Sequence, residues 1–358
     1  MNLDDLERFQ SIDSEGMLAT IDSLPDQLQQ AWDQGQKEPL ADISGVRQII
    51  VAGMGGSAIG GDLLSAYAAR MATVPVHVWR DYDLPVYANG PEILVITSSF
   101  SGNTEETISA FECGLEAGTQ LLVVTTGGQL AERARSAGIP LWRFEHPGPP
   151  RAVVGFSFGL LLAALFRLGL IPDPEAEMLD AVAAMREQQS HLRAEIPVAK
   201  NPAKRLAGQL IDRWPTIIGA GYLAPVARRW RTQIAELCKA VAQFEFLPEA
   251  DHNMVAGVTN PEAVFDSTMV LFLRGSLNHP HNLARIEVTK ELLMLEGFGT
   301  DVVEACGNSL LAQQWTALHY GDYVSYYLAM VYGENPTPIA AIEDLKVRLK
   351  RLLGRTEE

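Results

Sequence analysis

The stretch that decides the fold is "VRQIIVAGMGGSAIGGDLLSAY", residues 46–67. It begins as a β-branched apolar run, passes through a glycine-rich turn and continues as a helix-length segment. A continuous apolar run of this kind is typical of a strand buried on both faces of a parallel sheet. The glycines leave the backbone of this turn uncovered by side chains. Either a tight strand-to-helix turn or a ligand that approaches the backbone would explain them.

Similar units follow along the whole chain. In the first half, apolar runs at 74–82, 92–99 and 120–125 alternate with helix-length sequence, and "PTIIGAGYLAPVARRWRTQIAEL" at 215–237 repeats the strand, glycine turn and helix order. This alternation predicts an α/β protein with two domains, each a parallel sheet between layers of helices. A length of 358 residues also favours two cores over one.

The connecting sequence suggests where these domains begin and end. Polar, proline-flanked sequence separates the two halves, and the apolar run at 153–171 is short and contains Arg167, which favours a buried core helix over a membrane span. We expect an N-terminal helical segment at 1–40, a first domain at 41–175, connecting helices at 176–205 and a second domain with a terminal helix at 206–358.

The charge balance restricts the partners. With 28 basic and 44 acidic residues, the formal net charge is -16, which argues against nucleic acid and anionic membranes but permits a local anion site. The three cysteines are odd in number, widely spaced and free of CxxC pairs, which argues against a disulfide framework and a zinc site. The acidic start lacks the features of a secretory signal, so we expect a cytoplasmic protein.

The strongest local signal is "SSFSGNTEET", residues 98–107, which follows an apolar strand and precedes a helix. Ligands of open α/β sheets bind at the carboxyl ends of strands, where Ser99, Ser101 and Thr104 could bind one tetrahedral anion with the helix N–H groups. A capping box is the alternative, although capping needs only one hydroxyl. The matching place in the second half, residues 273–283, lacks most of these hydroxyls, so only the first half is expected to hold phosphate.

Other motifs are less specific. The turn at 53–61 lacks the Gly-Lys-Ser/Thr ending of a phosphate-binding P-loop, and the next strand ends in Arg80 rather than the acidic residue of a dinucleotide site. Four residues are of functional types in unusual surroundings, although each could be an ordinary solvated side chain. They are Arg151 after "HPGPP", Glu236 in the helix after the second glycine turn, His252 in a loop and Lys346 in the final helix.

Taken together, "GMGGSAIGGD" and "SSFSGNTEET" make this sequence resemble the bifunctional phosphoglucose/phosphomannose isomerases of the sugar isomerase (SIS) domain superfamily. The likeness extends to Pro150 and Arg151, to the helix with Glu236, to His252 and Asn253, and to the ending "PTPIAAIEDLK". It implies two SIS domains, a homodimer with sites at the subunit interface, and interconversion of glucose 6-phosphate or mannose 6-phosphate with fructose 6-phosphate. It implies no cofactor and no metal ion.

The resemblance also implies a role for each site residue. Glu236 would be the base, Arg151 would stabilise the cis-enediolate, and His252 from the other subunit and Lys346 would open the sugar ring and position it. Gly55 and Gly56 would let the sugar approach the backbone. The phosphate would be held by four hydroxyls, those of Ser57, Ser99, Ser101 and Thr104.

The chain departs from the family pattern at two positions. Met254 stands where the family usually has Glu, and Ala235 where it commonly has Asn. The first change removes a carboxylate close to His252 and bears on the balance between the two substrates. Two other functions remain open on the sequence. One is a non-catalytic sugar-phosphate-binding SIS regulator, and the other is an isomerase of another phosphosugar.

Overall fold

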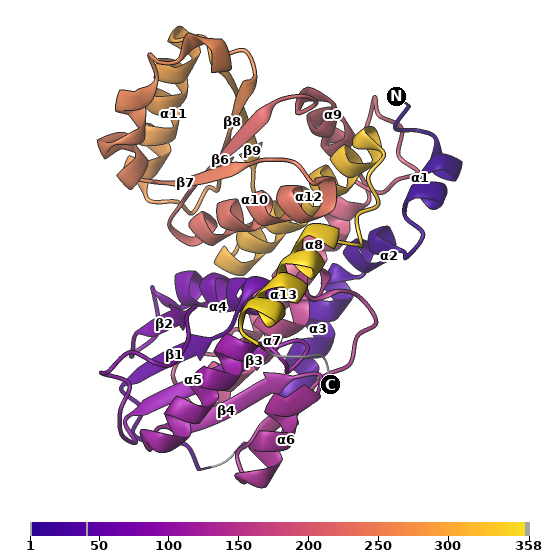
Figure 1. Ribbon diagram of the computed structural model, residues 1–358. Coiled ribbons are helices and arrows are strands. Elements are labelled where there is room, and N and C mark those ends of the chain that lie inside the picture. The colour runs from indigo at the N-terminus through magenta and orange to yellow at the C-terminus, as the bar shows by residue number, and fades with distance from the viewer. Residues whose placement is uncertain (1, 41, 355–358) are drawn as a thin grey trace.

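The computed structural model describes residues 2–40 and 42–354, which form two α/β units with one parallel sheet each (Figure 1). The boundary expected at residue 41 and the outer limits at 1 and 358 fall outside these residues. Every strand pair is parallel in both sheets. The expected α/β fold with two parallel sheets flanked by helices is therefore confirmed.

The first sheet has the strand order β2-β1-β3-β4-β5. Its central strand β3 is buried at every residue, as a strand covered by helices on both faces must be. The strands are β1 (Gln48–Ala52), β2 (Val76–Trp79), β3 (Ile93–Ser99), β4 (Gln120–Thr125) and β5 (Leu141–Arg143). Its flanking helices include α4 (Gly55–Ala68), α5 (Glu105–Glu116), α6 (Gly128–Ser136) and α7 (Val154–Arg167).

The second sheet repeats this plan with the order β7-β6-β8-β9, which matches the first four positions of the first sheet. The strands are β6 (Trp214–Ala220), β7 (Gln243–Leu247), β8 (Thr268–Arg274) and β9 (Gly299–Glu304). The helices of this half are α9 (Pro202–Gln209), α10 (Ala224–Cys238), α11 (Pro280–Leu295) and α12 (Leu310–Tyr332). The repeated strand order agrees with the duplication that the sequence suggests.

One hydrophobic core joins the two units. It includes Ile49 of the first sheet, Ile217 of the second, and Trp315 of α12. Helix α7 carries apolar residues all round and is buried accordingly, as a core helix should be. Across the described residues, we find no helix with both the length and the apolar character needed to span a membrane.

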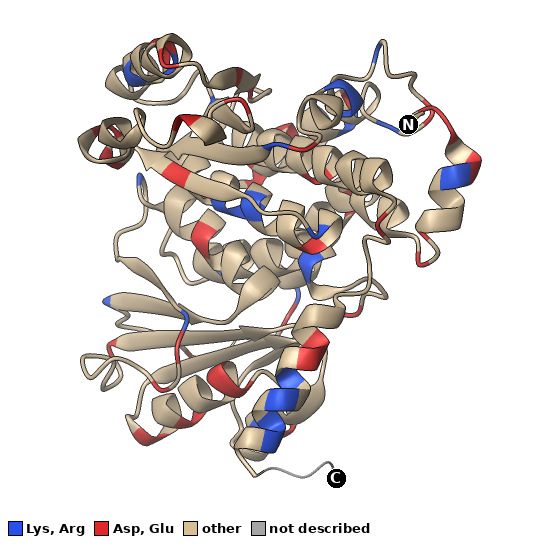
Figure 2. Cartoon of the chain, turned by 45° about the horizontal axis from the view of Figure 1, so that its top comes forward, with Lys and Arg blue, Asp and Glu red and all other residues tan. Residues whose placement is uncertain are grey.

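Helices from the N-terminal segment and the middle of the chain pack between the units. The N-terminal segment forms α1 (Leu6–Ile12), α2 (Met17–Asp22) and α3 (Leu24–Gly35), of which α3 packs on α7 and α2 on α12. Helix α8 (Glu175–Gln189) packs against both α3 and α12. The final helix, α13 (Ala340–Leu352), lies against the first unit in Figure 1, and Figure 2 shows basic residues gathered along it.

Candidate active site

A cavity of about 200 Å³ lies where α4 of the first unit faces α10 of the second. Three of the predicted site residues meet there with Glu236, namely Gly55, Gly56 and Arg151. The full lining is Gly55, Gly56, Ile59, Arg80, Arg151, Arg228, Arg229, Arg231, Thr232 and Glu236. Five guanidinium groups around one cavity in a chain of net charge -16 make this a site suited to an anion.

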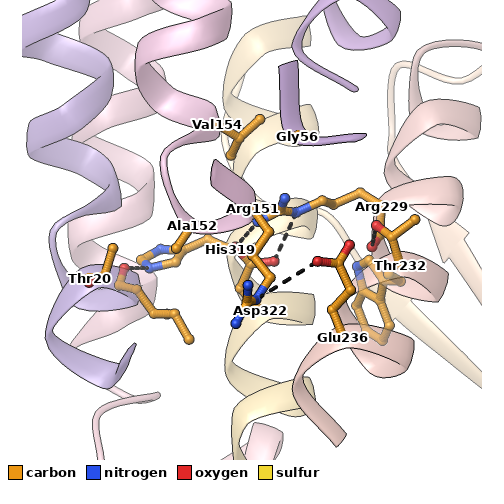
Figure 3. A network of polar contacts seen from close by, with 12 residues as sticks. Thr20, Gly56, Arg151, Ala152, Val154, Arg229, Thr232, Glu236, His319 and Asp322 are labelled. Carbon is orange, nitrogen blue, oxygen red and sulfur yellow. Dashed lines mark hydrogen bonds and ion pairs between the residues drawn. The ribbon is translucent and has the colours of Figure 1, made fainter. Parts of the chain in front are cut away.

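The centre of the cavity is the pair formed by Arg151 and Glu236 (Figure 3). Arg151 Nε lies 3.9 Å from Glu236 Oε2, and the two side chains are 7% and 27% exposed. The Arg151 guanidinium also donates to the carbonyl oxygens of Pro336, at 2.7 Å, and of Thr337. Burial lowers the pKa of Arg151, and the Glu236 carboxylate opposes this shift. The guanidinium is thus fixed by backbone oxygens while it faces a carboxylate.

Of the five polar residues of α10 that line the cavity, three lie on one face of the helix. Arg229, Thr232 and Glu236 are spaced three and four residues apart, which places them on the same side of a helix. Arg229 is buried and makes a bidentate pair with Asp322 of α12, with Nε to Oδ1 at 3.2 Å and Nη2 to Oδ2 at 2.9 Å. This pair anchors the helix that carries Glu236 to the core of its own unit.

The serine loop, residues 98–104, is held together by its own hydroxyls. Ser99 Oγ and Thr104 Oγ1 lie 2.9 Å apart, and the Gly102 N–H donates to Ser99 Oγ at 3.1 Å. Ser57 of α4 joins the loop, because its Oγ accepts a hydrogen bond from the Phe100 N–H at 3.2 Å. The four predicted phosphate residues therefore lie at the carboxyl end of β3. Ser101 differs from the others in being exposed, and its Oγ accepts a hydrogen bond from the Asn103 N–H.

The start of α5 supports the anion interpretation of this loop. Thr104 is the N-cap residue of α5, yet its side chain makes no capping hydrogen bond to the helix. Its hydroxyl faces Ser99 instead. Close packing does not distinguish this loop from the corresponding one of the second unit, because an added Cβ would clash at Gly102 as well as at Gly275. A phosphate site in the first half alone stays a prediction from the hydroxyls of this loop.

The glycine-rich turn is packed against the chain itself. A Cβ at Gly53 would lie 2.6 Å from the Ser98 carbonyl oxygen, and one at Gly56 would lie 2.5 Å from that of Pro150. Gly55 has φ +51° and open space around its Cβ position. Close backbone packing therefore accounts for Gly53 and Gly56. Approach of a sugar to Gly55 and Gly56, both of which line the cavity, stays a prediction.

His252 and Lys346 lie outside this cavity. His252 is exposed at the end of a 3-10 turn, η3 (Glu249–His252), where the sequence predicts a loop. The turn arises because the Asp251 N–H bonds back to the Pro248 carbonyl oxygen. Lys346 is exposed on α13. One chain alone does not bring either residue to Glu236, and the contribution of His252 from a second subunit stays a prediction.

Several residues of the site were not predicted. Asp62 of α4 accepts hydrogen bonds from Arg80, which follows β2, and from Arg228 of α10 at 3.0 Å, so one carboxylate orients two of the cavity's cations. The basic run "RRWR" at 228–231 was a possible signal for this cluster. A larger cleft of 810 Å³, lined by residues of α8, α9 and β9, contains none of the predicted site residues.

Comparisons with known proteins identify the relatives of this chain. Residues 199–349 match the family described as the bacterial phospho-glucose isomerase C-terminal SIS domain. A bifunctional phosphoglucose/phosphomannose isomerase of Caldicellulosiruptor bescii is 35% identical, over 94% of this chain and 99% of that protein. One of Aquifex aeolicus is 33% identical, over 89% and 96%.

The solved structures add a likeness of fold. A hypothetical protein of Thermus thermophilus superposes with a TM-score of 0.72 over 97% of this chain and 94% of that one. At 16% sequence identity, this likeness concerns the fold alone. The identity to the curated relatives, which extends over nearly their whole length, decides the family. The chain belongs to the bifunctional phosphoglucose/phosphomannose isomerases.

Proposed function

We propose that the chain interconverts glucose 6-phosphate or mannose 6-phosphate with fructose 6-phosphate through a cis-enediolate. The observation that carries the proposal is the pairing of Glu236 with the buried Arg151 across a cavity whose other wall is the N-terminus of α4. Family membership supports the same reaction, and the curated relatives bear the names of isomerases rather than regulators. The sugar-phosphate-binding regulator is therefore not favoured.

The chemistry fits the two charged groups. Isomerisation takes a proton from C2 of the open-chain aldose and returns one to C1, so a single carboxylate such as Glu236 can accept and deliver it. Negative charge develops on oxygen in the enediolate, and a fixed guanidinium stabilises that state more than the substrate. Both hexose epimers give the same enediolate. Arg151 supplies the positive charge, so the proposed route needs neither a metal ion nor a cofactor.

The serine loop would hold the phosphate. The Ser99 and Thr104 hydroxyls lie within hydrogen-bond distance of each other. Ser57 Oγ accepts from a backbone N–H of the same loop, and Ser101 is exposed. The N-terminus of α5, which Thr104 leaves without a side-chain cap, would add its N–H groups. This arrangement would fix one end of the sugar while Glu236 and Arg151 act at the other.

The proposed roles of His252 and Lys346 require contacts that one chain alone does not make. We place His252 in the site of a partner subunit of a homodimer, where an imidazole would exchange protons as the sugar ring opens near neutral pH. Lys346 would position the substrate once α13 approaches the cavity. A cytoplasmic enzyme fits the absence of disulfides among the described cysteines, which are all free thiols.

Replacing Glu236 by Gln tests the proposal. In a coupled assay with glucose 6-phosphate and mannose 6-phosphate, Glu236→Gln should lower kcat by about 10²- to 10⁴-fold, the usual contribution of a general base. Glu291→Gln makes the same change at an exposed position of α11 and should leave kcat unaltered. Equal rates for Glu236→Gln and the parent would remove Glu236 as the base. Tight binding of both sugar phosphates by the parent without turnover would instead indicate the regulator.

A further inference from the structure

Lys239 ends helix α10 in a left-handed backbone conformation, with φ 54° and ψ 29°. Glycine usually occupies this position, and lysine rarely does because its Cβ crowds the backbone. Asp83 and Asp212 share the conformation, but they are of a residue type that tolerates it better. A lysine kept in this conformation suggests that its side chain has a specific task.

The left-handed turn brings the Lys239 ammonium back over the end of its own helix. Nζ donates to the carbonyl oxygen of Glu236 at 2.9 Å and to that of Leu237 at 3.4 Å. These are two of the last carbonyls of the helix, which lack partners within it. The ammonium therefore holds the backbone of the residue that carries the proposed base.

The same ammonium reaches the segment that holds Arg151. Its third hydrogen bond is to the Asn335 carbonyl oxygen, at 2.8 Å. The Asn335 side chain then accepts from the Thr337 N–H at 3.0 Å, which fixes the short loop between them. The carbonyl oxygens of Pro336 and Thr337 in this loop are the acceptors for the Arg151 guanidinium.

All three donors of the ammonium are thus used on carbonyl oxygens, and they connect the two halves of the catalytic pair. Two of the bonds secure the helix end with Glu236, and the third secures the loop that binds Arg151. We propose that Lys239 is a positioning residue for the isomerisation and sets the separation between the Glu236 carboxylate and the Arg151 guanidinium. The inference rests on the proposed function of these two residues.

Lys239→Gly gives a direct test, because glycine adopts the left-handed conformation freely and keeps the fold. We expect kcat for both hexose 6-phosphates to fall about tenfold to hundredfold, the range for a small misplacement of catalytic groups. KM should stay within about twofold, since the phosphate is bound elsewhere. The melting temperature should not decrease. Lys239→Arg retains a cation with several N–H donors and should recover most of the lost kcat.

Asp212→Gly is the matched control, because it makes the same backbone change at an exposed position before β6. It should retain the parent kcat. An unchanged kcat in Lys239→Gly, an equal loss in Asp212→Gly, or failure of Lys239→Arg to recover activity would overturn the positioning role. If Lys239→Gly does not fold, Lys239→Asn replaces it in the same test, because asparagine also tolerates the left-handed conformation. A parent that converts neither substrate would refute the proposed function instead.

Discussion

The Nε atom of Arg151 is buried and has no hydrogen-bond partner among the described residues, although Nη2 of the same guanidinium donates to two carbonyl oxygens. Buried donors are nearly always satisfied, so an unsatisfied one in a cavity wall is available to a ligand. Its direction depends on the turn at Pro150, which packs on the backbone of Gly56. The absence of a side chain at Gly56 therefore helps to set the position of the Arg151 guanidinium.

Gly56→Ala should show this dependence. The added methyl group would lie 2.5 Å from the Pro150 carbonyl oxygen and 3.3 Å from Arg151 Cα, so the turn must shift. We expect kcat/KM to fall about a hundredfold from misplacement of Arg151, and stability to fall by about 1–3 kcal/mol. Gly208→Ala, near the end of α9 with open space around it, should gain up to about 1 kcal/mol and keep its activity. Full activity of Gly56→Ala would contradict the argument.

At the scale of elements, the sequence predicts strands and helices well because apolar runs and glycine turns recur with a regular period. It leaves two interpretations for Thr104, since a helix cap and an anion site use the same residue types. In the structure, the Thr104 hydroxyl faces Ser99 and does not cap α5, while its role in binding an anion stays a prediction. Asn201, by contrast, caps α9 by accepting from the N–H groups of Ala203 and Lys204.

Thr104→Val removes the hydroxyl and keeps the shape of the side chain. We expect it to lower the free energy of unfolding by about 1 kcal/mol at most, for the lost bond to Ser99. KM for both hexose 6-phosphates should rise about tenfold or more, because a bond to a charged phosphate is stronger. Asn201→Ala should show the reverse pattern in denaturant titrations and kinetics, a loss of about 1–2 kcal/mol with unchanged KM. If Thr104 only stabilises the fold, Thr104→Val will lower the free energy of unfolding and leave KM unchanged, as Asn201→Ala does.

At the scale of the whole molecule, the repeated halves can be predicted from the repeated order of apolar runs, but the contacts between distant segments cannot. Arg151 binds carbonyls of residues 336 and 337, and Arg229 binds Asp322 of α12. These pairings depend on how α10, α12 and the last loop pack, and no local pattern encodes that packing. The same holds for His252, whose proposed role depends on a second subunit.

The junction of the N-terminal segment with α12 makes stability depend on pH. His319 is fully buried, its Nε2 bonds the Ile21 carbonyl oxygen at 2.9 Å, and its Nδ1 has no partner in the described structure. Burial lowers the pKa of His319 from 6.5 to about 4, although the Ile21 carbonyl and Asp322 oppose this shift. The unfolded chain therefore binds a proton between these pH values that the folded chain excludes.

The contribution of neutral His319 to the free energy of unfolding is fully present above pH 6.5. It decreases by about 3 kcal/mol as the pH falls toward 4. Burial raises the pKa of the Asp22 carboxyl, which acts in the opposite direction at the acid end of this range. His319→Gln retains Asp22 and removes only the imidazole. Its unfolding free energy, measured by urea titration from pH 7 to pH 4, should therefore fall less steeply than that of the parent. Parallel curves for the two proteins would show that His319 does not govern acid stability.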